Sequence, residues 1–114
     1  MDSILTSIKK LLGIAEDYEY FDSDIIMHIN SVFAILTQMG VGPPEGFSIE
    51  DEYAEWNDFI QDKQSLVSVK SYIHLKVKLM FDPPTSSALM ESAQRMINEL
   101  EWRLNLAAET NQSV

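Results

Sequence analysis

Hydrophobic residues recur at the three- and four-residue spacing of an amphipathic helix in several stretches of the chain. The first stretch covers residues 2–12 and stops before Gly13, and the second covers residues 22–39 and stops before Gly40. Glycine is the residue that most often follows the end of a helix. The two stretches therefore predict a short N-terminal helix and a long second helix. Leu36, in the apolar stripe of the second, is expected to be buried.

A third helix is predicted over residues 64–81, and its apolar residues fall on two sides. One side carries Leu66, Val69, Ile73, Val77 and Met80, and the other carries Tyr72, Leu75 and Leu79. A helix with two apolar sides packs against a neighbour on each of them. We therefore expect this helix at the centre of a bundle, with Ile73 buried.

Two consecutive prolines, Pro83 and Pro84, end the third helix, because proline lacks the backbone N–H that the helix ladder needs. A last helix should follow and run to about Ala107. The pattern thus predicts an all-α fold, a small helical bundle of three long helices plus short N-terminal and inter-helix helices. We expect one domain over residues 1–108 and a flexible C-terminal tail over residues 109–114.

The segment between the second and third helices contains a loop and a short helix. The loop has two glycines and two prolines within residues 41–46, a composition that cannot continue a helix and should lie at the surface. It is either a plain connection or a segment that reaches a neighbouring subunit. A short helix is expected from Asp51, with Tyr53, Trp56 and Phe59 as anchors in the core.

Charge is distributed unevenly along the chain of 114 residues, whose net charge is −10. Between Leu11 and Asp62 there are twelve acidic residues and no Lys or Arg, which gives this segment −12 against +2 for the rest. Affinity for nucleic acid comes mainly from basic side chains. The acidic segment therefore argues against DNA binding and favours a surface that repels DNA or docks on a basic partner.

No pattern of catalytic or metal-binding residues is found in the sequence. His28 and His74 fall on different predicted helices, and the acidic run from Asp51 to Asp62 lacks the alternating ligands and central glycine of a calcium loop. There is no cysteine, no nucleophile elbow and no phosphate-binding glycine loop. We expect a protein that is no enzyme and needs no cofactor or metal, with no membrane span and no secretory signal.

Several motifs in order along the chain resemble those of short head–tail connector proteins of long-tailed bacteriophages. The likeness covers about Ile8 to Leu106. The motifs are FDSDIIMHINSVF at residues 21–33, LTQMGVGP at 36–43, GFSI at 46–49, WNDF at 56–59, VKSYIHLKV at 69–77, FDPPTSS at 81–87 and ELEWRLN at 99–105.

This resemblance implies a structural role at the head–tail junction of the virion, after assembly in the host cytoplasm. Members form a ring of about a dozen copies under the portal protein, extend the DNA channel without binding DNA, and carry the next tail-side connector or stopper protein. The resemblance assigns the last helix and tail, Glu91 to Val114, to the portal side and the segment Val41 to Ile49 to ring or tail-side contacts. The candidate assembly surfaces are Val41, Gly42, Pro43, Pro44, Glu45, Gly46, Phe47, Glu91, Arg95 and Arg103.

An alternative from another functional class is an acidic inhibitor that mimics DNA and occupies a host nucleic-acid-binding protein. Small size and strong negative charge suit both hypotheses. The inhibitor requires carboxylates spread along one face at the spacing of phosphates, and a basic host protein should co-purify with it. The connector requires surfaces for its own copies and for the portal.

Overall fold

The structure, a computed structural model, describes residues 3–112, and their side chains through residue 109. Over these residues the chain is all-α, with five helices and no strand, as predicted. The helices are α1 (Ile4–Leu11), α2 (Asp22–Gln38), α3 (Trp56–Phe59), α4 (Lys63–Phe81) and α5 (Ser87–Gln112).

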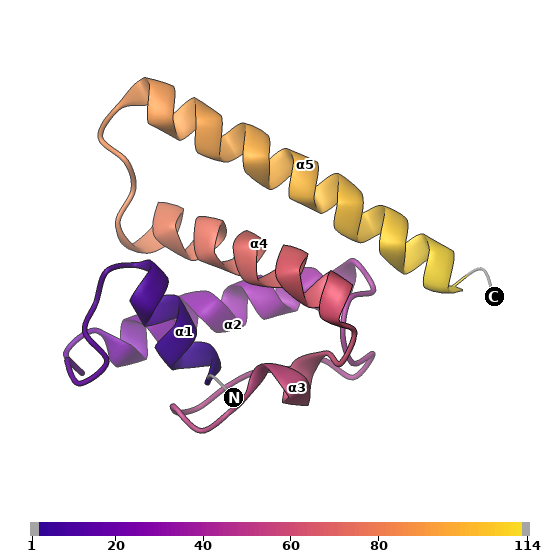
Figure 1. Cartoon of the computed structure of the whole chain (residues 1–114), viewed down its shortest axis with the longest axis horizontal. Helices are drawn as coiled ribbons and strands as arrows, with labels where there is room; N and C mark the ends of the chain where they lie inside the picture. The colour runs from indigo at the N-terminus through magenta and orange to yellow at the C-terminus, as the bar shows by residue number, and fades with distance from the viewer. Residues whose placement is uncertain (1–2, 113–114) are drawn as a thin grey trace.

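Helix α4 lies at the centre of the bundle (Figure 1). It runs antiparallel to α5 on one side and to α2 on the other, and α1 also contacts it. The predicted two-sided packing is therefore confirmed: Ile73 and Tyr72, from the two predicted sides, are both fully buried. Met80 is the exception in the predicted stripe, because it lies in the last turn of α4 and is 43% exposed.

The core is built mainly by α1, α2 and α4, and α3 closes it from below in the view of Figure 1. Leu36 is fully buried, as expected from its place in the stripe of α2. Trp56 and Phe59 of α3 are also buried, and the indole N–H of Trp56 donates to Ser7 Oγ of α1 at 3.1 Å. A helix of only four residues is not stable by itself, and here two buried aromatic side chains anchor it in addition to a capping box between Glu55 and Asp58.

Tyr53 is not a core anchor, contrary to the sequence-based expectation. The short helix begins only at Trp56, and Tyr53 precedes it in a turn with its side chain 77% exposed. The Tyr53 N–H donates to Asp51 Oδ1 at 2.9 Å, a side-chain turn that competes with helix formation. Next along the chain, the Ala54 carbonyl accepts from Ile4 N at 2.9 Å. These bonds fix residues 51–54 in a non-helical path.

Helix α5 continues beyond Ala107, where the sequence-based boundary was placed, and ends at Gln112. Neither glycine nor proline follows Ala107, and Ala108 is buried, so helix propensity and packing both favour continuation. The division into a domain of residues 1–108 and a flexible tail of residues 109–114 stays a prediction. Its last two positions lie outside the described residues.

Candidate assembly surfaces

The loop that follows α2 is anchored at both ends. At its start, the Val41 N–H donates to the Leu36 carbonyl of α2 at 2.9 Å. Further along, the Asn30 side chain forms two hydrogen bonds with the backbone of Ile49: Oδ1 accepts from its N–H at 2.8 Å, and Nδ2 donates to its carbonyl at 2.9 Å. The loop therefore leaves α2 and returns to it along a fixed path.

Aromatic packing holds the middle of the loop. The Phe47 ring lies 5.0 Å from the ring of Phe33 and 5.3 Å from that of Phe59, measured between centroids. Gly42 adopts a φ of +85° and lies so close to Phe59 that an added Cβ would meet its Cε1 at 2.3 Å. Only glycine satisfies both conditions, because other residues rarely adopt positive φ and all carry a Cβ.

The tip of the loop is the exposed part of residues 41–47. Pro44 and Glu45 are exposed in a turn closed by the Gly46 N–H, which donates to the Pro43 carbonyl at 3.0 Å. Of the other predicted assembly positions here, Val41 is buried and the remainder are half-buried. The loop therefore offers a small, rigid projection. That this projection contacts a partner stays a prediction.

Helix α5 is held along one stripe. Ile97, Leu104 and Ala108 are buried against the rest of the molecule. The Tyr72 hydroxyl of α4 donates to Glu101 Oε2 of α5 at 2.6 Å. Burial, together with this carboxylate, raises the pKa of Tyr72, so the hydroxyl remains a donor at any physiological pH.

The outward side of α5 is open to solvent. The predicted assembly residues Glu91, Arg95 and Arg103 are all exposed, Arg103 on the side that faces the start of α4. Arg103 pairs at 2.8 Å with Glu99, four residues before it on the helix, whereas no ion pair joins Glu91 and Arg95 in the described part of the chain. Trp102, which was not among the predicted residues, is 66% exposed on the outward side. Its signal was available, since at ~100° per residue it falls opposite the buried stripe.

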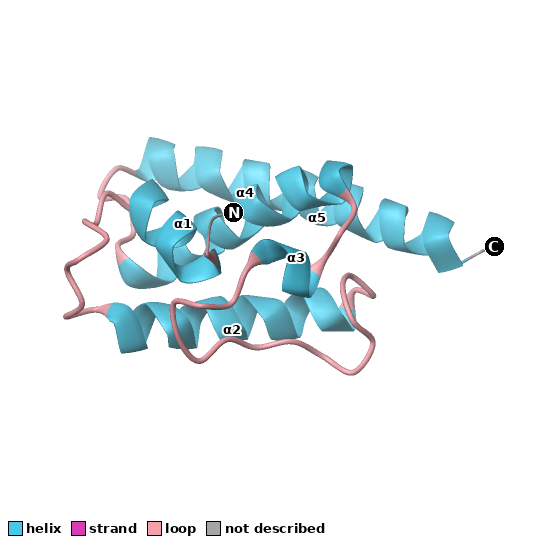
Figure 2. Cartoon of the chain, turned by 60° about the horizontal axis from the view of Figure 1, so that its bottom comes forward, coloured by secondary structure: helices cyan, strands magenta, loops and turns pink. Residues whose placement is uncertain are grey.

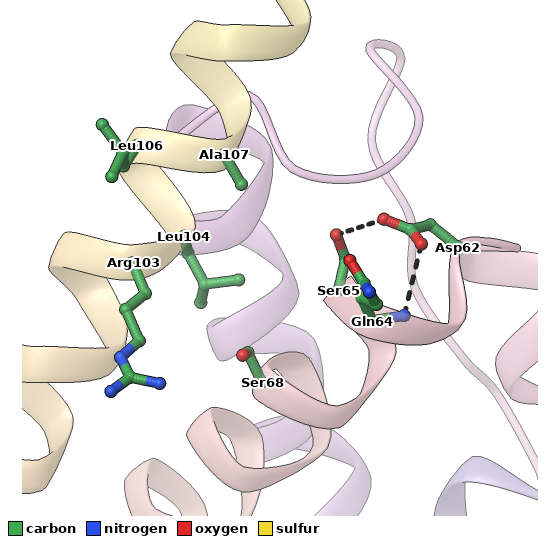
Figure 3. A pocket seen from close by; sticks show the side chains of 8 residues that line it. All are labelled: Asp62, Gln64, Ser65, Ser68, Arg103, Leu104, Leu106 and Ala107. Atoms are coloured by element: carbon green, nitrogen blue, oxygen red, sulfur yellow. Dashed lines mark hydrogen bonds between the residues drawn. The ribbon is translucent and has the colours of Figure 1, made fainter.

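Arg103 lies on the wall of an open groove of about 440 Å³ between α5 and the start of α4 (Figure 3). Asp62, on the other wall, caps α4 by accepting from Gln64 N at 3.2 Å and from Ser65 Oγ at 2.7 Å. The hydrogen bond from the Ser65 hydroxyl lowers the pKa of Asp62 most, and the bond from the backbone N–H of Gln64 lowers it further.

The predicted assembly surfaces are only partly brought together. A recess of about 50 Å³ lined by Val41, Gly42, Leu104 and Ala108 shows that the base of the loop lies beside the C-terminal half of α5. Arg103 therefore lies at the same end of the molecule as the loop. Glu91 is about 18 Å from it along the helix, at a rise of 1.5 Å per residue.

Nearly all acidic residues of the base-free segment are exposed. Those of two separate segments converge: Glu19, Glu50, Asp51 and Glu52 line one shallow recess between the start of α2 and the turn before α3. With no Lys or Arg in the segment, this side of the molecule is strongly negative. Such a surface repels DNA phosphates.

No metal or membrane signal is found within residues 3–112. No group of three or more His, Asp or Glu side chains is placed to hold a metal ion there. Burial lowers the pKa of His74, which favours its neutral form at pH 7. None of the described helices is long and apolar enough to cross a bilayer.

The family model described as phage connector protein matches residues 4–111, nearly the whole chain. The chain belongs to the phage connector protein family. No curated protein and no solved structure matches it. The family assignment confirms the resemblance to bacteriophage connectors, and it places this all-α protein in a structural family.

One charged residue of the connector was missed by the sequence analysis. Lys9 of α1 is buried, and its ammonium donates to the carbonyls of Glu16 at 2.9 Å and Tyr18 at 2.7 Å. It also lies 2.8 Å from Asp22 Oδ1, a buried oxygen at the start of α2. Lys9 thereby fixes the loop between α1 and α2. No spacing rule predicts this pair, because a loop separates the two residues.

Proposed function

We propose that this connector is a head–tail adaptor subunit. In this role it forms a ring under the portal of the DNA-filled head, extends the DNA channel and offers a docking platform to the next tail-side protein. The observation that carries the proposal is the match to the phage connector family over residues 4–111. It also favours a structural role over the acidic host inhibitor, which the family assignment does not predict.

The outward side of α5 is the proposed portal surface. It is the longest of the described helices, it forms one edge of the molecule (Figure 1), and it exposes Trp102, Arg95 and Arg103. Tryptophan and arginine are enriched among the residues that contribute most to binding at protein interfaces. The rigid tip at Pro44 and Glu45 is the proposed contact for the ring or the tail side.

The acidic residues of the base-free segment are proposed to face the channel. DNA must move through a connector ring in both packaging and ejection, so strong binding to the wall would hinder it. A wall without Lys or Arg does not displace the counterions of DNA and gains no affinity from them.

The test is removal of the gene from the phage, with the intact gene supplied on a plasmid as the control. We expect filled or fillable heads and complete tails that fail to join, and heads that lose DNA, as counted by electron microscopy of lysates. The plasmid copy should restore joined particles. Infectious, fully joined particles made without any copy of the protein would overturn the adaptor role.

A further inference from the structure

The exposed side of α2 differs from that of the other described helices, because it carries no charge over about three turns. Between Ile25 and Pro44 there is no Asp, Glu, Lys or Arg. The exposed residues of this part of α2 lie at the three- and four-residue spacing of one helix face and form what we call the α2 ridge: Met27, Ser31, Ala34 and Gln38. Met27, which is 58% exposed, is the large apolar side chain of the ridge.

The hydroxyls on and beside the α2 ridge are already bonded within the helix. The Ser31 hydroxyl donates to the Met27 carbonyl at 3.0 Å, and the Thr37 hydroxyl donates to the Phe33 carbonyl at 3.0 Å. DNA and strongly charged proteins are attracted by charges of the opposite sign, and this face has none to offer them. The centres of protein interfaces, by contrast, are depleted of charged residues. The ridge therefore suits a partner surface that carries no unpaired charge.

A groove with such a surface lies where the end of α1, the second half of α4 and the start of α5 meet. Its volume is about 640 Å³, and its apolar lining includes Leu11, Leu75, Leu89, Ala93 and Met96. Two charged residues line it, Lys78 and Asp82, and they pair with each other at 2.7 Å, so their charges cancel. The groove stays open because the buried stripe of α5 begins only at Ile97.

Three other recesses of the described surface suit an uncharged ridge less well. The groove of about 440 Å³ has Arg103 and Asp62 on opposite walls, and the recess of about 370 Å³ contains Lys10 and Glu16. No ion pair joins the members of either couple in the described part of the chain. The recess beside the start of α2 is lined by several carboxylates and no base. A ridge laid in any of these would remove unpaired charges from water, which costs free energy.

The α2 ridge and the 640 Å³ groove lie on opposite sides of α4. Helix α4 lies between α2 and α5 in Figure 1, and Figure 2 shows α2 along the lower edge of the molecule with α4 and α5 at the upper edge. The ridge is opposite the buried stripe of α2, so it faces away from α4. It therefore cannot reach the groove of its own subunit, and a contact between the two surfaces joins different copies head to tail.

The ridge and the groove also lie at the same level along the bundle. The Phe21 ring packs on the Phe81 ring at 5.1 Å, which places the start of α2 beside the end of α4. Met27 lies six residues after Phe21, and Leu75 of the groove lies six residues before Phe81. At a rise of 1.5 Å per residue, each is about 9 Å from the ring contact. Because the two helices are antiparallel, Met27 and Leu75 stand level with each other.

A shared level favours a ring over a filament. A head-to-tail contact that shifts each copy along the axis builds a helical filament, whereas a contact without a shift closes when the rotation per subunit divides the circle. A second copy is also the partner that most needs neutral surfaces. Each copy has a net charge of −10, so two copies repel each other wherever their charged surfaces meet.

We propose that the α2 ridge of one copy docks in the 640 Å³ groove of the next copy. Met27 enters the groove and packs against Leu75 and Leu89, and the small side chains of Ser31 and Ala34 let the two surfaces approach closely. This inference rests on the proposed ring-forming function and names the surfaces of the ring contact. Since the ridge is short, each pairwise contact is weak, and the ring depends on many of them together.

Cysteine cross-linking tests the contact, since the natural chain has no cysteine to interfere. The double variant M27C/L89C is oxidised within purified phage particles and then run on a non-reducing gel. We expect a ladder of covalent multimers, because each copy links to the next. The control is M27C/V67C, because Val67 is 68% exposed against 61% for Leu89 but lies about 12 Å before Leu75 along α4. It should remain monomeric.

The other outcomes separate this contact from its alternatives. The single variant M27C should stay monomeric, whereas a dimer would mean that two ridges face each other, an arrangement that ends at two copies and overturns the proposal. Particles that contain the double variant but show no ladder would overturn the contact and leave the adaptor role standing. A ladder from the V67C control, or a cross-link from M27C to another virion protein, would also overturn it. Absence of the protein from joined particles would overturn the adaptor role and the contact with it.

Discussion

The part of the chain before α5 and helix α5 are held in the fold in different ways. Before α5, side chains tie the loops to the helices: Lys9 holds the loop after α1, and Asn30 holds the loop after α2. Among the residues whose side chains the structure describes, helix α5 is held mainly along the stripe that contains Ile97 and Leu104, with the Tyr72–Glu101 bond beside it.

This difference separates stability from assembly. In the part before α5, an exposed residue such as Pro44 is flanked by buried or half-buried residues of the same loop. Most substitutions there therefore alter folding as well as binding to a partner. In α5 the outward side chains are exposed, so substitutions there should alter binding to a partner and leave the stability of the fold nearly unchanged. Three substitutions with matched controls test this comparison, and the expected effects on folding decrease from the first to the last.

The largest effect is expected for Lys9→Met. The methionine keeps the apolar stem but removes the ammonium, which leaves two carbonyls and the buried oxygen of Asp22 without their partner. Breaking a buried ion pair from one side costs about 3–5 kcal/mol. Since the two carbonyls lose their donor as well, and the Asp22 side chain is only 26% exposed, we expect a loss within that range, measured by urea unfolding.

Lys10→Met is the control for this experiment. Lys10 is the next residue of α1 and is exposed, so its loss should change the free energy of unfolding within ~0.5 kcal/mol. If both variants unfold at the same denaturant concentration as the parent, the buried ammonium does not hold the loop, and the part before α5 is less tightly tied than the structure indicates.

The second prediction concerns the loop after α2. Ala at position 42 must adopt positive φ and also displaces Phe59, whereas at position 46 nothing lies within 4 Å of the added Cβ. The backbone conformation alone costs about 1–2 kcal/mol. We therefore expect Gly46→Ala to lose about that much and Gly42→Ala to lose about 1–3 kcal/mol more, because of overpacking. Equal melting temperatures for the two variants would contradict the close packing of the loop.

The sequence predicted the long helices because their apolar stripes continue for several turns. It located the central helix from its two apolar sides and the loop from its glycines and prolines. It failed at Tyr53, because an aromatic residue in a short segment has no periodicity to show which way it points. It also failed at Lys9, since burial of a lysine depends on carbonyls that only the folded loop brings near.

The candidate surfaces were predicted less completely than the fold. Composition marked the loop over residues 41–47 but did not show that only Pro44 and Glu45 are accessible. Glu99 and Arg103 form an ion pair, whereas Glu91 and Arg95, at the same spacing on the helix, stand apart because exposed pairs gain little by closing. The apolar groove beside the start of α5 depends on how far α5 lies from α4, and no local pattern encodes that distance.

The last prediction concerns the outward side of α5, where the effect on folding should be smallest and the effect on function largest. Trp102→Ala combined with Arg95→Glu removes an exposed ring and reverses an exposed charge, so unfolding should change little, within about 1 kcal/mol for the two together. The same variant should fail to restore joined particles when it replaces the natural copy, because its portal surface is lost. Leu104→Ala on the buried side of the same helix is the control, and it should lower both stability, by about 2–5 kcal/mol, and joining. If the outward variant still restored full infectivity, α5 would not be the portal surface, and the contrast between its two sides would reflect packing alone.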